Sequence, residues 1–224
     1  MKITIFGATG GIGAECLRLA LAAGHEVTAV VRDAGRLSLE PHHVMVADLR
    51  IAPDMKELTV ACEGADGVLS GIGPRSPKQD RGVVTEATRV IVAAMHAAHA
   101  RRIVIVSAAP VSTVPTPGNP DAPRRDPGEG AFTRYVLTPI VKRALSSVYA
   151  DLAAAEDVLR ESGLDWTAVR PPRLTDKPGT GRYRTAPERN LTRGHTIPRA
   201  DVAAAMLAMV NQPSTIGHAI GVAT

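Results

Sequence analysis

The chain has 224 residues, of which 45% are hydrophobic and 21% charged, as in an ordinary soluble globular protein. This length fits one domain, and no apolar stretch reaches the roughly 18 to 20 residues of a membrane-spanning helix. The net charge of +4 and the pI of about 9.4 do not indicate nucleic-acid binding, because the basic residues are dispersed and aromatic residues, at 3%, do not interleave with them.

The two cysteines, Cys16 and Cys62, both fall in predicted helices and show no metal-ligand spacing. We therefore expect no metal site, and we expect the reduced thiols of a cytoplasmic protein. The residues before the first glycine, Met1 to Phe6, are too few for a secretory signal peptide.

Short apolar runs alternate with helical segments along the chain. The predicted strands are Lys2–Phe6, Glu26–Val31, Val44–Ala47, Gly67–Ser70, Arg102–Ser107 and Trp166–Val169, with Ala219–Val222 as an edge strand. The predicted helices are Ala14–Ala23, Val83–Ala100, Tyr135–Glu161 with a break near Pro139, and Asp201–Val210. This alternation predicts βαβ units and a parallel sheet that helices cover on both faces, within one α/β domain over residues 1–224.

Residues 110–130 interrupt the alternation. Six prolines and three glycines stand among these 21 residues, together with several charges, and this composition excludes a regular helix or strand. We expect a loop over the active-site face. A disordered insertion without a role is the alternative.

The glycines Gly7, Gly10 and Gly13 form a GxxGxxG pattern between the first strand and the first helix. A tight turn needs residues without a Cβ, a diphosphate needs close approach to the backbone, and a helix start offers free N–H groups to an anion. Thr9 adds a hydroxyl donor, and Gly11 and Ile12 complete the turn. The pattern and its place predict a dinucleotide site.

The end of the second strand indicates which dinucleotide binds. Asp33 lies about 20 positions past the glycines, where an acidic residue would hold the ribose hydroxyls of NADH. Arg32 precedes it and Arg36 follows one turn later, and two guanidinium groups suit a 2′-phosphate. We expect NADPH in preference to NADH. The alternative is that Arg32 is a solvated charge and Asp33 binds the ribose.

Further cofactor contacts are expected after the third and fourth strands. Asp48 follows the third strand and is predicted to accept a hydrogen bond from the adenine amino group, with a turn cap as the alternative. Gly71, Ile72 and Gly73 follow the fourth strand, at the edge where such sheets bind ligands. Arg75 is placed to contact a phosphate there.

Together these segments resemble the atypical short-chain dehydrogenase/reductases, an NmrA-like, NAD(P)-binding group, and most closely the biliverdin-IXβ reductase/flavin reductase group. The resemblance is carried by Ile5–Gly10, Val31–Asp33 with Arg36, Asp48–Leu49, Ala93–Met95, Ser107–Ala108, Leu159–Leu164, and Pro171–Pro172 with Asp176, Pro178, Thr180–Gly181 and Tyr183. The last segment is the most specific.

The resemblance implies a single-domain Rossmann fold with NADPH over the sheet's carboxyl edge, and reduction of a flavin, tetrapyrrole or quinone-like acceptor. By position, the residues implied to line the cofactor are Thr9, Gly10, Ile12, Gly13, Arg32, Arg36, Asp48, Leu49, Arg75, Pro172 and Arg173. Ser107 matches the family's serine at the end of the fifth strand.

Three features depart from the resembled families. The Tyr-x-x-x-Lys pair of common short-chain dehydrogenases falls on Val148 and Leu152, and the nearby Tyr149 is offset by one residue. Arg173 stands where the flavin reductase group has a histidine. The 110–130 insertion has no counterpart.

An electron-poor hydride acceptor needs little acid catalysis from the protein. We expect Ser107 to orient the carboxamide or the acceptor, Arg173 to stabilise negative charge on the acceptor, and Tyr149 to be a weaker candidate proton donor. The expected partner is a small-molecule acceptor, with no nucleic acid or membrane, and the oligomeric state stays open. A non-catalytic NmrA-like redox sensor and an isomerase or dehydratase are the alternatives.

Overall fold

The computed structural model describes residues 1–51, 53–74, 80–123, 126 and 145–224. Its centre is an eight-stranded sheet with the order β3-β2-β1-β4-β5-β6-β10-β8. All neighbouring strands are parallel except β10 and β8. The first six strands have the order of the doubly wound Rossmann fold, which confirms the predicted fold class.

The strands and helices of the described chain are bounded as follows. The strands of the large sheet are β1 Lys2–Phe6, β2 Glu26–Val31, β3 His43–Val46, β4 Gly67–Ser70, β5 Arg102–Val106, β6 Asp165–Arg170, β8 Arg184–Pro187 and β10 His218–Ala223; β7 Arg173–Thr175 and β9 Thr196–Pro198 form a separate parallel pair. The α-helices are α1 Gly11–Ala22, α2 Met55–Cys62, α3 Val83–Ala97, α5 Ser146–Glu161 and α6 Arg199–Val210, and the 3-10 helices are η1 Ala34–Arg36, η2 Ala109–Thr113 and η4 Pro213–Thr215.

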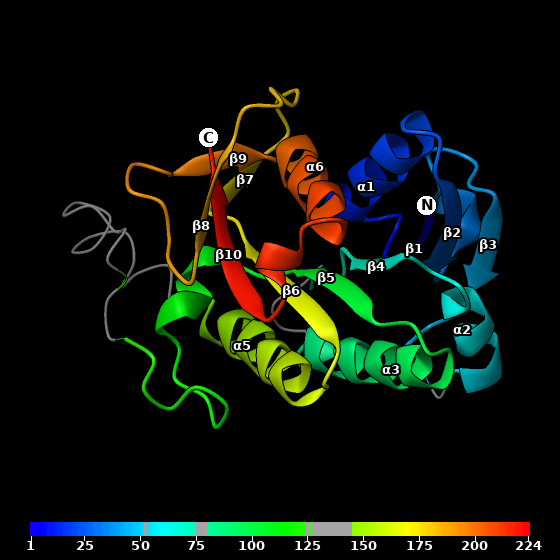
Figure 1. Cartoon of the computed structure of the whole chain (residues 1–224), viewed down its shortest axis with the longest axis horizontal. Helices are drawn as coiled ribbons and strands as arrows, with labels where there is room; N and C mark the ends of the chain where they lie inside the picture. The colour runs from blue at the N-terminus through cyan, green and yellow to red at the C-terminus, as the bar shows by residue number, and fades with distance from the viewer. Residues whose placement is uncertain (52, 75–79, 124–125, 127–144) are drawn as a thin grey trace.

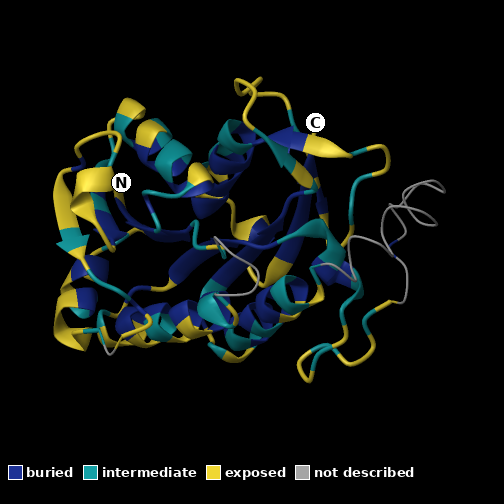
Figure 2. Cartoon of the chain, turned by 180° about the vertical axis from the view of Figure 1, so that it is seen from behind, coloured by how far each residue is buried: buried dark blue, intermediate teal, exposed yellow. Residues whose placement is uncertain are grey.

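Helices cover both faces of the sheet, α1 and α6 on one and α2, α3 and α5 on the other (Figure 1). The side chains of β5 point alternately to the two faces of the sheet: Ile103 and Ile105 pack in one core, and Val104 and Val106 pack in the other. Figure 2 shows the strands buried between two helical layers whose outer sides are exposed. A strand buried on both faces explains its continuous Ile-Val-Ile-Val sequence.

Several predicted boundaries and one strand position need correction. The strand Ala219–Val222 is not at the edge: β10 pairs with β6 on one side and with β8 on the other. Sequence reasoning missed β8 because only Ala186 of its residues is buried, so no apolar pattern marks it. The first helix begins three residues before Ala14, at Gly11, since the glycine turn itself leads into the helix.

The proline-rich segment is tied to α5 in the part that the structure describes. Asp157 of α5 accepts hydrogen bonds from Thr116 Oγ1 at 2.8 Å and from the amide of Gly118 at 3.0 Å. The prediction of a loop from Pro110 onward was wrong for its first four residues, which belong to the 3-10 helix η2. The predicted helical start at Tyr135 lies outside the described residues, and the described part of that helix begins at Ser146.

Neither cysteine is accessible to reagents in the folded protein. Cys16 and Cys62 are free thiols with no exposed surface, and burial raises the pKa of each to about 12. Because the thiolate is the reactive form, we expect neither thiol to react with a disulfide reagent at mild pH, and both to react after denaturation. Rapid labelling of the native protein would contradict this burial.

Among the described residues, no helix combines the length and apolar character needed to cross a membrane. The same residues hold no group of three or more His, Cys, Asp or Glu side chains arranged for a metal ion.

Candidate functional site

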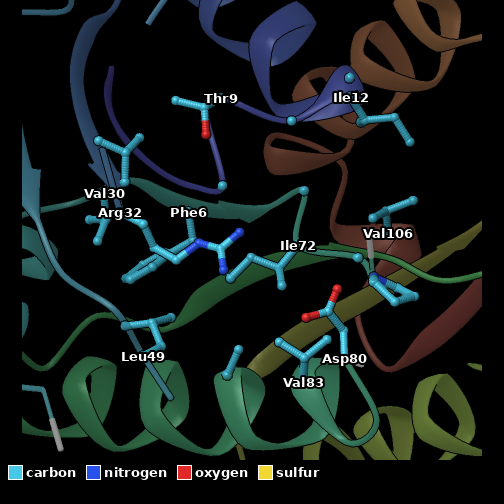
Figure 3. A pocket seen from close by; sticks show the side chains of 18 of the residues that line it. Phe6, Thr9, Ile12, Val30, Arg32, Leu49, Ile72, Asp80, Val83 and Val106 are labelled. Atoms are coloured by element: carbon cyan, nitrogen blue, oxygen red, sulfur yellow. The ribbon is translucent and has the colours of Figure 1, made fainter. Parts of the chain in front are cut away.

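A cleft of about 390 Å³ opens at the carboxyl ends of the central strands. It lies beside β1, which pairs with β2 on one side and β4 on the other, so the strand order reverses here. Doubly wound sheets bind ligands at this point. Figure 3 shows Thr9 and Ile12 on one side of the cleft and Leu49 and Val83 on the opposite side.

Most of the predicted cofactor residues come together here. Those that line the cleft are Gly7, Thr9, Gly10, Gly11, Ile12, Arg32, Asp48, Leu49, Gly71, Ile72, Gly73 and Ser107. They come from five different segments of the chain, one after each of β1 to β5, which the parallel sheet brings to one edge.

The glycine turn presents an uncapped helix start to the cleft. Gly7 has φ +77°, a conformation that favours glycine, and its carbonyl accepts from the Gly10 amide at 2.9 Å. Gly10 is the N-cap residue of α1 and makes no side-chain cap hydrogen bond. The amides of the first turn of α1 therefore lack intrahelical partners and face the place where an anion would bind.

The third glycine serves close packing. A Cβ on Gly13 would stand 2.1 Å from the Gly7 carbonyl oxygen, and a Cβ on Gly71 would stand 2.8 Å from the Gly13 nitrogen. Three backbone segments thus meet where no side chain fits. Gly13 itself does not line the cleft, and its part is to hold α1 against β1 and β4.

The two residues after β2 differ in what they offer a ligand. Asp33 accepts from the Gly35 amide at 3.0 Å and so caps η1. Arg32 extends into the cleft (Figure 3), and its guanidinium makes no hydrogen bond or ion pair with the described residues. The basic side chain is therefore available to a ligand, while the acidic one is engaged in a turn.

Asp48 also caps a turn, and it pairs with an arginine that the sequence did not single out. Its carboxylate accepts from the Arg50 amide at 3.1 Å, from Arg50 Nε at 3.0 Å and from Arg50 Nη2 at 2.8 Å. The Arg50 hydrogen bond, aided by the charges of Arg50 and Arg32, lowers the pKa of Asp48 to about 2. Asp48 is thus ionised at neutral pH, and Arg50 also reaches Asp80 at 3.5 Å.

Ser107 marks the other end of the cleft, directly after β5. Its amide donates to the Val169 carbonyl at 2.7 Å, which ties the segment to β6. Its hydroxyl donates to Glu156 Oε1 at 2.7 Å, and only 6% of the residue is exposed. Val106 and Leu152 also line the cleft, so this end combines one hydroxyl with apolar walls.

Some predicted residues lie away from the cleft lining. Tyr149 packs in the core beside α3, and burial raises the pKa of its phenol. Arg36, Pro172 and Arg173 are not part of the lining either, and Arg173 is exposed at the start of β7. Arg75 lies outside the described residues.

Sequence reasoning missed several residues of the lining. They are Phe6, Val30, Val31, Ala47, Arg50, Pro74, Asp80, Val83, Ala87, Val106, Leu152, Leu174 and Arg199. The apolar ones carry no signal beyond strand and helix periodicity. Arg50 had a local signal in its spacing of two residues from Asp48, whereas nothing near Arg199 connects it to a glycine turn far away in the sequence.

Arg199 is the basic residue closest to the glycine turn in the described lining. It begins α6, pairs with Asp176, and lays its side chain across Gly11, where a Cβ would stand 2.7 Å from Arg199 Cδ and Nε. Because this places a guanidinium beside the uncapped start of α1, Arg199 is positioned to contact a diphosphate.

We expect Arg199→Ala to weaken NADPH binding about tenfold, the value of one charge-assisted contact. Fluorescence titration with NADPH measures the change. The matched control is Arg182→Ala, which removes the same charge from an exposed position outside the lining and should leave binding unchanged. Equal losses in both variants would show a general charge effect rather than a contact.

Comparison with solved structures gives matches along the whole chain. SP1627 of Streptococcus pneumoniae TIGR4, provisionally named an NADH-flavin reductase, is 22% identical with a TM-score of 0.75, covering 100% of this chain and 99% of that one. A short-chain dehydrogenase/reductase of Veillonella parvula DSM 2008, solved with NADP, is 21% identical with a TM-score of 0.74, covering 100% and 94%. ChuY, the anaerobilin reductase of Escherichia coli O157:H7, is 23% identical with a TM-score of 0.70, covering 99% and 97%. At these identities the likeness shows a shared fold.

The sequence comparison agrees over the same length. The uncharacterized sugar epimerase YhfK of Bacillus subtilis strain 168 is 29% identical over 227 aligned residues, which cover 98% of this chain and 92% of that protein. A family model described as NAD(P)H-binding matches residues 7–213, from the first glycine of the turn to the first residue of η4. The chain belongs to this NAD(P)H-binding family of Rossmann-type proteins.

Proposed function

We propose that the protein is an NADPH-dependent oxidoreductase that transfers hydride to a flavin, tetrapyrrole or quinone-like acceptor. The observation that carries the proposal is the cleft itself. It joins Arg32, which has no ion pair among the described residues, with the uncapped start of α1 and the Ser107 hydroxyl in one continuous lining. The names of two similar folds, a flavin reductase and an anaerobilin reductase, support the choice of acceptor class.

The arrangement after β2 favours NADPH over NADH. Asp33 is engaged in capping η1, whereas Arg32 points into the cleft without a partner among the described residues. A guanidinium without an ion-pair partner attracts a 2′-phosphate. A carboxylate that already accepts a hydrogen bond within a turn is not available to the ribose hydroxyls. We propose the start of α1 and Arg199 for the diphosphate, and the Asp48–Arg50 segment for the adenosine end.

When bound, the nicotinamide supplies the hydride. The chain's own residues would hold the reactants and exclude water at the Ser107 end. Ile12, Ile72, Val106 and Leu152 give that end apolar walls, and apolar walls keep a site dry. No tyrosine or lysine lies in the described lining, so the described residues offer no phenol or amine for acid catalysis there. An acceptor that is already electron-poor fits this lining.

The test mixes the protein with NADPH and a panel of flavins, quinones and linear tetrapyrroles and follows NADPH absorbance. We expect turnover with at least one acceptor, and a lower rate at saturating NADPH for Ser107→Ala and for Arg173→Ala. We propose Arg173 as a contact of the acceptor only. Tyr149→Phe should keep full activity, because the phenol lies in the core. Tight NADPH binding without turnover on any acceptor would reject the reductase proposal.

The same lining favours one other candidate, a non-catalytic redox sensor. Leu152 stands where the common short-chain dehydrogenases have the lysine of their Tyr-x-x-x-Lys pair, and it lines the cleft, so a bound dinucleotide would meet an apolar side chain there. A sensor would bind NADPH without turnover. An isomerase, the class to which the epimerase activity in the name of YhfK belongs, needs a positioned acid or base. The described lining holds no tyrosine or lysine for this role, and its two carboxylates, Asp48 and Asp80, both contact Arg50.

A further inference from the structure

Glu156 of α5 is a fully buried carboxylate behind the Ser107 end of the cleft, and the proposed hydride transfer does not use it. Its Oε1 accepts from Ser107 Oγ at 2.7 Å and from Arg170 Nε at 2.9 Å. Its Oε2 accepts from Arg170 Nη2 at 2.5 Å and from Arg160 Nη2 at 3.0 Å. The four lone-pair directions of the carboxylate are therefore all used.

The direction of the Ser107–Glu156 hydrogen bond follows from these charges. Arginine keeps its proton in proteins, and two guanidinium groups face Glu156, so Glu156 is an ionised carboxylate. A carboxylate can only accept, and the shared proton must come from the Ser107 hydroxyl. A hydroxyl has one proton and two lone pairs, so Ser107 has only lone pairs left for the cleft. Within the described part of the chain, no other group donates to Ser107 Oγ.

We propose that Ser107 meets the ligand only as a hydrogen-bond acceptor, and that Glu156 is the positioning residue that imposes this polarity. The ligand group opposite Ser107 must then carry an N–H donor. In a cleft that holds a nicotinamide dinucleotide, this group is the amino half of the ring carboxamide. The inference rests on the proposed function, and it excludes Ser107 as a proton donor to the hydride acceptor.

Burial makes this polarity rigid. Arg170 is 4% exposed and Ser107 6%, so water does not compete for the hydroxyl proton. A hydroxyl proton in solvent rotates freely between partners. If the Ser107 proton rotated away from Glu156, the buried carboxylate would lose one of its four hydrogen bonds, and no water would replace it. The ion pair therefore selects ligands by the type of hydrogen-bonding group that faces Ser107.

The test compares NADP⁺ with its 3-acetylpyridine analogue, in which a methyl group replaces the carboxamide amino group and the carbonyl is kept. We expect the protein to bind NADP⁺ about tenfold more tightly, because the analogue leaves the Ser107 lone pairs without a donor. Ser107→Ala should weaken NADP⁺ to the level of the analogue and leave the analogue itself unchanged. Calorimetric titration of both ligands gives the two affinities.

The matched control is Ser112→Ala. Ser112 is also a buried serine of the segment after β5, but its hydroxyl donates to the Ala109 carbonyl and it does not line the cleft. This variant should keep the full preference for NADP⁺. A loss of preference in both variants would show that packing of the segment, and not the Ser107 hydroxyl, sets the preference, and would overturn the proposal.

Glu156→Gln tests the positioning role with a readout that misfolding does not imitate. The glutamine amide can donate to Ser107 Oγ, which frees the hydroxyl proton for the carbonyl that both ligands carry. We expect the tenfold preference to fall to about one by a gain in analogue affinity, since one hydrogen bond has changed direction. A general loss of structure would weaken both ligands instead.

Two results overturn the inference while the proposed function stands: Ser107→Ala weakens both ligands equally, or it changes neither. The first would mean that Ser107 donates to the carbonyl, and the second that it does not touch the ring. If the wild-type protein binds neither NADP⁺ nor NADPH, the proposed function itself fails. Because Ser107→Ala leaves the Glu156–Arg170 pair in place, the test does not depend on the folding of the Glu156 variant.

Discussion

Gly13→Ala is expected to abolish NADPH binding and to destabilise the fold by about 3 kcal/mol, the upper range for an added methyl group in a packed interior. The new Cβ would stand 2.1 Å from the Gly7 carbonyl oxygen and 2.7 Å from its carbon. Gly7 cannot yield, because its amide donates to Val30 and its carbonyl accepts from Gly10. The alanine would therefore push α1 away from β1 and open the turn that presents the free amides.

Thermal unfolding and NADPH titration measure the two effects. A chain of this size loses roughly 2–4 °C in Tm for each kcal/mol of stability. The matched control is Gly73→Ala at the same edge of the sheet, where a Cβ meets nothing within 4 Å, so its Tm should not change. A Gly13 variant that unfolds with the wild-type Tm and binds NADPH normally would show that α1 sits farther from β1 than the structure places it.

The fold was predictable where burial is uniform along an element. The runs that became β1, β2, β4 and β5 are mostly apolar and almost entirely buried, since helices cover both faces, and their predicted bounds agree with the structure within one residue. The strands β7, β8 and β9 have short, partly exposed sequences with no such signal. The edge position predicted for β10 failed for the same reason, because the strand that covers it was invisible.

The site was predictable where one local segment makes it. The glycine turn and Arg32 stand next to strand ends, and sequence position alone placed them at the edge of the sheet. Arg199 reaches the cleft from a helix far along the chain, and Glu156 reaches Ser107 from behind the cleft. Sequence gives no sign of the second contact, because a lone glutamate on a helix is usually solvated. Asp33 had the right spacing for a ribose contact, but spacing does not reveal that its carboxylate is held by the Gly35 amide.

Arg32→Ala is expected to weaken NADPH binding about 100-fold and to leave NADH binding nearly unchanged, because two charge-assisted hydrogen bonds to a 2′-phosphate are worth about 3 kcal/mol. Arg32 extends into the cleft and forms no ion pair with another described residue, so its removal leaves no described carboxylate without its partner. NADH, which lacks the phosphate, serves as the internal control. Titration of the wild type and the variant with both cofactors gives the ratio directly.

Salt dependence provides a second measure of the same contact. Added salt should weaken NADPH binding to the wild type more than to the variant, because the lost contact is an exposed charge pair that ions screen. Arg36→Ala should cost less than Arg32→Ala, since Arg36 is exposed and does not line the cleft. If Arg32→Ala weakens NADPH and NADH equally, the guanidinium contacts a part common to both cofactors, and the preference for NADPH must be given up. Tighter binding of NADH than of NADPH by the wild type would assign the ribose to Asp33, released from its turn.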